Sequence, residues 1–410
     1  MSALSLPAST DRYARKKDAI IAAAAETLNV QGIKGMTLAD VAAKVGLSTT
    51  SVTYYFRKKE DLAAACLLSA IDRVREVAAE AAEETTTAGR VMRLIDGHLE
   101  RYARMRNGAE PARALFNDVR ALTPPKSEVV FEAYNNMFRH VRTLFDTPEM
   151  AWLGRAERNA RTHTLIEQMN WMSAWLPAYD TVDYGRIGER MFDILSHGLA
   201  AEGSTWSPEP SALAALVEAE ADNTAATTFL VAATALVNEQ GYRGASVDKI
   251  SARLGVTKGS FYHHNDAKDD LVAACFDRSF DIIRRMQLAS LGRGGSYWTR
   301  LSTAAAALVR YQLSPHGPLL RSSAVSALPQ SLQPVMFAQS DRVAQRFAGM
   351  ISDGVAEGTI RPVDPFIAAQ MITSMINSTA DLPLWVRGVT AEEAPDLFAR
   401  PLLLGSLKAI

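Results

Sequence analysis

The sequence predicts an all-α protein built from two tandem copies of one unit. Residues 29–66 align without gaps with residues 238–275, at a constant offset of 209 and with 13 identities in 38 columns. Apolar residues follow helical spacing in both copies, and each copy places a glycine turn between two short helical segments. Self-similarity at a fixed offset defines the repeated unit before any single element is assigned.

Composition limits the class of protein. Of 410 residues, 48% are hydrophobic and 8% aromatic, which is enough to form packed cores, and the net charge is −1. A nucleic-acid partner would therefore have to meet a local basic patch. Two cysteines argue against a disulfide scaffold. Because neither a signal peptide nor an apolar run of bilayer length is evident, we expect a cytoplasmic protein with no membrane partner.

The first copy reads as three helices. Apolar residues recur every four positions from Ile20 to Leu28, which predicts one buried stripe on a first helix. Gly32 is expected to end that helix. Thr37 then stands at the N-cap position of a second helix with apolar i, i+3, i+4, i+7 spacing. After a turn that contains glycine, a short third helix is expected over residues 49–55.

The second copy repeats these signals. Ser246 takes the place of Thr37, and a short helix is expected over residues 258–264. Two short helices around a glycine turn are the signature of a helix-turn-helix. Its duplication at a fixed offset makes coincidence improbable.

The stretch after each copy has the same length, 135 residues, and a helical Ala/Leu/Met-rich pattern. A segment with glycine, serine and two prolines separates the halves and reads as a linker. The predicted domains are a first helix-turn-helix domain (11–66), a first helical lobe (67–201), a linker (202–212), a second helix-turn-helix domain (220–275) and a second helical lobe (276–410).

The segment TLADVAAKVGLSTTSVTYYFRKKEDL, residues 37–62, resembles the DNA-binding signature of the TetR family of bacterial transcriptional regulators. SVDKISARLGVTKGSFYHHNDAKDDL, residues 246–271, is similar over the same span. The resemblance implies that each half is one complete unit: three DNA-binding helices, then a helical lobe for ligand sensing and dimerisation. One chain would then contain both partners and form an intramolecular pseudo-dimer.

In a helix-turn-helix the second helix of the motif enters the major groove, where short hydroxyl side chains allow close approach and supply hydrogen-bond donors and acceptors. The family motif also implies a phosphate-gripping lysine at the start of the fourth helix, and two aromatic residues of which one touches phosphate and one packs inward. The DNA-binding residues expected in the first copy are Thr37, Ser48, Thr49, Thr50, Ser51, Thr53, Tyr54, Tyr55 and Lys59. Those expected in the second are Ser246, Thr257, Lys258, Gly259, Ser260, Tyr262, His263, His264 and Lys268.

The two copies differ in charge. Residues 11–66 carry nine Lys/Arg and six Asp/Glu, a net of +3, whereas residues 220–275 carry five and seven, a net of −2. A basic arm that includes Arg12 and Lys16 precedes only the first copy. Because phosphate neutralisation dominates non-specific DNA affinity, we expect the first domain to be the main DNA reader and the second to bind more weakly.

The lobes suggest an interface and a pocket. The resemblance implies that the last two helices of each lobe form a four-helix dimer interface, with apolar stripes within residues 184–201 and 365–384. The candidate pocket residues for a small apolar or aromatic effector are Met169, Trp171, Met172, Trp175 and Tyr179, although stripes of aromatic residues and Met more often form plain core.

Other functions receive less support. No catalytic motif is present, and the adjacent His263 and His264 would point about 100° apart on a helix, so we expect no enzyme, no metal site and no cofactor. The leading hypothesis is a ligand-responsive repressor that binds double-stranded DNA. The alternatives are a conventional homodimer that uses only its first domains, and a TetR-like protein-interaction adaptor.

Overall fold

The computed structural model describes residues 8–116, 122–209, 224–242, 244–255, 268–321, 324–325, 328 and 332–408. These residues are helical almost throughout, and their only β-type pairing is an isolated antiparallel bridge between Ala200 and Ile360. The all-α prediction is confirmed. No helix among these residues is both long and apolar enough to cross a bilayer.

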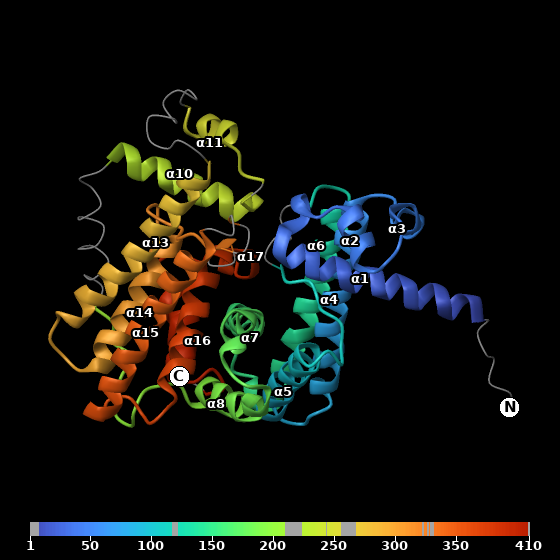
Figure 1. Cartoon of the computed structure of the whole chain (residues 1–410). Helices are drawn as coiled ribbons and strands as arrows, with labels where there is room; N and C mark the ends of the chain where they lie inside the picture. The colour runs from blue at the N-terminus through green and yellow to red at the C-terminus, as the bar shows by residue number, and fades with distance from the viewer. Residues whose placement is uncertain are drawn as a thin grey trace.

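The first half begins with a small group of three helices, the first head, and continues into a larger helical lobe (Figure 1). The head contains α1 (Ala8–Gly35), α2 (Leu38–Lys44) and α3 (Thr49–Tyr55). The lobe contains α4 (Lys59–Ala82), α5 (Thr87–Arg106), α6 (Lys126–Arg142), α7 (Arg155–Trp175) and α8 (Tyr184–His197), with short 3-10 turns at Thr143–Phe145, Pro148–Met150, Leu176–Ala178 and Thr181–Asp183.

The second half repeats this order in its described part. Its head contains α10 (Thr224–Gln240) and α11 (Val247–Leu254). Its lobe contains α13 (Lys268–Leu291), α14 (Tyr297–Leu313), α15 (Gln333–Glu357), α16 (Pro365–Ser378), η7 (Thr379–Asp381), α17 (Leu382–Trp385), η8 (Pro395–Ala399) and α18 (Arg400–Leu404).

Local sequence signals determine how each head folds. Gly32, with φ 66° and ψ 172°, interrupts the helical backbone of α1 because few other residues adopt this conformation. Thr37 caps α2 by accepting a hydrogen bond from the Asp40 amide at 3.1 Å, and Ser246 caps α11 in the same way through the Lys249 amide at 3.3 Å. The caps and the glycine break lie where the sequence places them.

The two halves pack against each other through the last helices of both lobes. Helices α7 and α8 contact α16, and α18 packs on α8 (Figure 1). Backbone carbonyls of the second half accept hydrogen bonds from buried side chains of α7: Gln168 Nε2 donates to Met371 at 3.0 Å, and His163 Nε2 to Ser378 at 2.9 Å. The expected stripe residues are buried here, namely Ile187, Met191, Ile194, Leu195, Ile367, Met371, Ile372, Met375 and Ile376.

The segment between the halves runs along the second lobe. Trp206 Nε1 donates to the Asp396 carboxylate at 2.6 Å, and the Thr205 carbonyl accepts a hydrogen bond from Trp298 Nε1 at 2.8 Å. Glu209 pairs with Arg293. The proline-rich connection is therefore held against the protein as far as residue 209.

Candidate nucleic-acid interface and effector cavity

Helix α3 presents a polar face at the edge of the first head. Ser48 caps the helix through the Ser51 amide at 3.2 Å, and the two hydroxyls lie 2.8 Å apart. Thr53 donates to the Thr49 carbonyl at 2.9 Å, which fixes its rotamer. Ser48, Thr49, Thr50 and Thr53 are exposed. This is the arrangement that a recognition helix needs, with short hydroxyl side chains held in place and open to solvent.

The structure separates the two tyrosines that the sequence left ambiguous. Tyr54 is 76% exposed, whereas Tyr55 is half-buried against the core. Tyr13 from α1 packs on both rings, with centroids 4.8 Å from Tyr55 and 6.3 Å from Tyr54. Tyr54 is thus the ring available to a partner, and Tyr55 joins α3 to α1.

Two predicted phosphate-binding residues are engaged within the protein. Lys59, at the start of α4, is half-buried, and its Nζ donates to the Lys34 carbonyl near the end of α1 at 2.7 Å. Thr37, besides capping α2, donates its hydroxyl hydrogen to the Asp40 carboxylate at 2.7 Å. The Lys59 ammonium has three N–H donors, so the bond to this carbonyl fixes its position and leaves donors for a phosphate.

The basic segment that was expected as an arm forms the first turns of α1 and is helical. Arg12, Arg15 and Lys16 are exposed on the first turns of α1, which project from the head (Figure 1). Lys17 is half-buried, with its Nζ 6.0 Å from the centre of the Phe56 ring. The positive charges therefore have a fixed direction relative to α3.

The second head is described only in part. Predicted DNA-binding residues that lie outside the described residues are Thr257, Lys258, Gly259, Ser260, Tyr262, His263 and His264. Lys268 stands over the Tyr242 ring, 4.5 Å from its centre. Arg253 pairs with Glu239 at 2.8 Å, and Lys249 Nζ donates to the Gln240 side chain at 2.5 Å. These two basic residues, Lys249 and Arg253, are thus engaged within the head itself.

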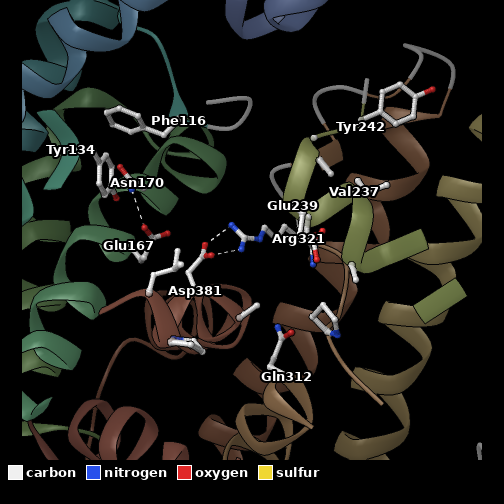
Figure 2. A pocket seen from close by; sticks show the side chains of 18 of the residues that line it. Phe116, Tyr134, Glu167, Asn170, Val237, Glu239, Tyr242, Gln312, Arg321 and Asp381 are labelled. Atoms are coloured by element: carbon white, nitrogen blue, oxygen red, sulfur yellow. Dashed lines mark hydrogen bonds and ion pairs between the residues drawn. The ribbon is translucent and has the colours of Figure 1, made fainter. Parts of the chain in front are cut away.

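A cavity of about 1380 Å³ lies between the halves and reaches both heads (Figure 2). Phe116, Tyr134 and Trp385 form an aromatic wall, with ring centroids 5.5 and 5.9 Å apart along this order. Apolar side chains of α1, α4 and α10 complete the lining. Such a space suits an apolar or aromatic guest, because cavities of this kind bury ligand surface against side chains of the same character.

Among the described residues, six charged ones line the cavity, namely Arg113, Glu167, Glu239, Arg253, Arg321 and Asp381. Arg321 and Asp381 form an ion pair from the second half, and the Glu167 carboxylate of α7 accepts a hydrogen bond from Asn170 Nδ2 at 3.2 Å (Figure 2). Burial raises the pKa of Glu167, because desolvation disfavours its charged form. These groups offer a guest polar contacts beside the aromatic wall.

The five pocket residues expected from the sequence are not among the residues that line this cavity. Met169, Met172 and Trp175 are buried, Trp171 Nε1 donates to Gln370 Oε1 of the other half at 3.0 Å, and Tyr179 packs on Phe366.

The part of α7 that lines the cavity differs in chemistry from the five predicted residues. The face of α7 that meets the cavity is polar, since it presents His163, Glu167 and Asn170 at i, i+4 and i+7. A polar stripe on a helix that is otherwise buried is the sequence signal that could have identified this face of the cavity. A search for aromatic residues passes over such a stripe. The five residues stay a prediction of a pocket within the first lobe, and the cavity between the halves is a separate candidate site.

Two family models match parts of this chain. A family model described as "Bacterial regulatory proteins, tetR family" matches residues 20–66 and again residues 229–275. A second, "Tetracyclin repressor-like, C-terminal domain", matches residues 294–386. The Transposon Tn10 TetC protein of Escherichia coli is 44% identical over 45 residues, which are 11% of this chain and 23% of that protein. The match thus spans about a quarter of that relative.

Solved structures match less than half of the chain. Apo AibR is 21% identical, with a TM-score of 0.36, and the match covers 44% of this chain and 98% of AibR. The TetR family transcriptional regulator PfmR from Thermus thermophilus is 22% identical, with a TM-score of 0.36, and the match covers 43% and 97% of the two chains.

Proposed function

We propose that this chain, which belongs to the TetR family of bacterial regulatory proteins and carries two of its units in tandem, is a repressor that binds one operator with both of its heads. A small apolar or aromatic effector in the shared cavity releases the operator. The observation that carries the proposal is the exposed polar face of α3, held in a helix-turn-helix and framed by Tyr54 and the basic turns of α1.

The first head is the main DNA reader in this proposal. Its segment has a net charge of +3, against −2 for the corresponding segment of the second head. Arg12, Arg15 and Lys16 are exposed on the turns of α1 that carry Tyr13, the residue that packs on α3. In the second head, Lys249 and Arg253 pair with Gln240 and Glu239. Since phosphate neutralisation dominates DNA affinity, the first head anchors the chain and the second adds its own binding afterwards.

One chain is the proposed DNA-binding unit. Buried hydrogen bonds from Gln168 and His163 join the two lobes, which supports one packed body that carries both heads. Covalent linkage also holds the second head near the DNA at roughly millimolar effective concentration. Because the heads differ in sequence, the operator need not be palindromic, and its half-sites should lie about 34–36 Å apart.

The test is selection of genomic fragments with the purified chain, followed by footprinting of the best fragment at defined salt. Two unlike half-sites in one footprint, bound by a single chain, are expected. Tyr54→Ala should reduce affinity more than Lys268→Ala, and equal losses would contradict dominance of the first head. A palindrome bound by two chains would indicate the conventional homodimer instead.

A protein-interaction adaptor is the second candidate. The acidic second head favours it, because a net charge of −2 opposes DNA binding. An adaptor would protect no fragment even at low salt. The wild-type chain and Tyr54→Ala would then give the same result.

A further inference from the structure

One asparagine in each half joins the head to the wall of the cavity. In the first half, Asn29 Nδ2 donates to the Arg113 carbonyl at 2.8 Å, and Asn29 Oδ1 accepts from the Leu115 amide at 2.8 Å. The amide side chain therefore pairs with two backbone groups of the segment after α5, much as a neighbouring strand would. Asn29 lies on α1, three residues before the break at Gly32.

The second half has the same pair of bonds. Asn238 Nδ2 donates to the Leu319 carbonyl at 2.9 Å, and Asn238 Oδ1 accepts from the Arg321 amide at 3.1 Å. Asn29 and Asn238 occupy equivalent positions in the repeat and are identical. We call these two sets of bonds the asparagine clamps. Their geometry is the same although the lobe sequences that they hold are unlike.

Both clamps stand in the wall of the shared cavity. Asn29, Arg113 and Leu115 line it from one side, and Asn238 and Arg321 line it from the other. Each clamp thus connects a surface that a guest would touch with the first helix of a head. In both halves the same two backbone groups, a carbonyl and the amide two residues later, are held by one side chain of that helix.

We propose that Asn29 and Asn238 are the links through which the contents of the cavity set the positions of the two heads. The inference rests on the proposed function, because it assigns the route by which an effector would act on DNA binding. A guest against the aromatic wall displaces Phe116, next to the Leu115 amide that Asn29 holds. The clamped segment carries α1 with it, and α1 carries the recognition helix.

The second clamp is reached through charge. The Arg321 amide binds Asn238, while the Arg321 guanidinium pairs with Asp381 in the cavity (Figure 2). A guest that breaks this ion pair removes a contact that holds Arg321, the residue whose backbone amide binds Asn238. The two heads are thereby sensitive to different features of one guest, an apolar surface for the first head and a polar group for the second.

The test measures the head position directly. Nitroxide pairs are placed at exposed sites of head and lobe, Ala43→Cys with Glu132→Cys in the first half and Ala252→Cys with Ala338→Cys in the second. Cys66 and Cys275 remain unlabelled because they are buried. Distance distributions from pulsed electron paramagnetic resonance should broaden or shift in the first half with Asn29→Ala, and in the second half with Asn238→Ala.

The control is Thr27→Val, which keeps the size of the side chain and removes a buried hydrogen bond within α1, to the Ala23 carbonyl at 2.9 Å. Unchanged distances in the asparagine variants, or an equal change in Thr27→Val, would overturn the proposal. Asn29→Asp keeps the acceptor for the Leu115 amide and serves if the alanine variant does not fold; it should give a smaller displacement in the first half alone.

Operator affinity is the second readout. On the operator selected with the wild-type chain, Asn29→Ala should bind at least about fivefold more weakly, the lower end of typical coupling between sites. The distances require neither DNA nor effector. If the chain selects no operator, the proposed function fails while the clamps are still tested; if an operator is bound but the distances do not move, only the clamps fail.

Discussion

At the residue scale, Tyr54 and Tyr55 should separate DNA binding from stability. Tyr54 is 76% exposed, so Tyr54→Ala should change the free energy of unfolding by no more than about 0.5 kcal/mol. The affinity of the Tyr54→Ala variant for operator should fall about tenfold, which corresponds to about 1.4 kcal/mol of binding free energy. Tyr55→Ala removes an aromatic ring between α1 and α3 and should destabilise the protein by about 1–3 kcal/mol.

Urea unfolding and fluorescence anisotropy on labelled operator measure the two effects. Tyr54→Phe isolates the hydroxyl, since it keeps the ring that packs on Tyr13. A Tyr54→Ala variant that lost stability but kept its affinity would reverse the roles assigned to the two rings.

His98 gives the chain a pH-dependent stability. Its Nδ1 must carry hydrogen, because it lies 2.8 Å from the Leu94 carbonyl, and burial together with the charge of Arg113 lowers its pKa to about 3. The unfolded histidine titrates near its ordinary value, so below that value only the unfolded chain takes up the proton. The contribution of His98 to the free energy of unfolding is therefore complete above the ordinary pKa of histidine. Below that pH it decreases by about 1.4 kcal/mol per pH unit until the pH approaches 3.

Urea unfolding between about pH 7 and pH 5 tests this dependence. His98→Gln should flatten the decline in stability toward acid, and His197→Gln, at an exposed histidine, should not. Equal slopes in all three proteins would mean that other groups control the acid sensitivity.

At the scale of the element, the first turns of α1 should act as a fixed basic extension of the DNA interface. Arg12, Arg15 and Lys16 are exposed on a helix that Tyr13 ties to α3. Replacing all three by alanine should reduce the slope of log affinity against log salt by about 0.9 for each phosphate that is no longer neutralised.

Anisotropy titrations at several salt concentrations give that slope. A matched control removes three exposed positive charges from the lobes, with Arg155, Arg186 and Lys408 changed to alanine. The same reduction in both triple variants would assign the effect to net charge rather than to the position of α1.

Elements governed by local chemistry were predictable from the sequence, and those governed by packing between halves were not. Helix α3 spans Thr49–Tyr55 as the motif indicated, because its cap and its glycine turn are local signals. The basic segment at the start of α1 was expected as an arm. It is helical, and Tyr13 within it packs on α3. The residues that line the cavity could not be predicted from the sequence, because they depend on which face of α7 is turned toward the other half.

At the scale of the whole molecule, the halves should act as one body only while Gly198 permits their close packing. Gly198 has φ 72°, and a Cβ there would lie less than 3.0 Å from the backbone of Leu403 and Leu404 in the other half. Gly203 has φ 84° with open space around its Cβ position. Alanine is strained at both sites because both φ values are positive. At Gly198, where ψ is −159°, the backbone lies in a region that almost only glycine adopts, so alanine there adds strain as well as the clash with the other half.

Gly198→Ala should therefore loosen the packing between the lobes, and the head-to-head distance between labels at Ala43→Cys and Ala252→Cys should broaden. The second head would then lose the fixed geometry that adds its half-site to the first, and affinity for the full operator should fall toward that for a single half-site. Gly203→Ala should bind the full operator as wild type does. If Gly198→Ala kept the full-operator affinity with a broadened distance, the linker alone would suffice to join the heads, and packing between the lobes would serve another purpose than DNA binding.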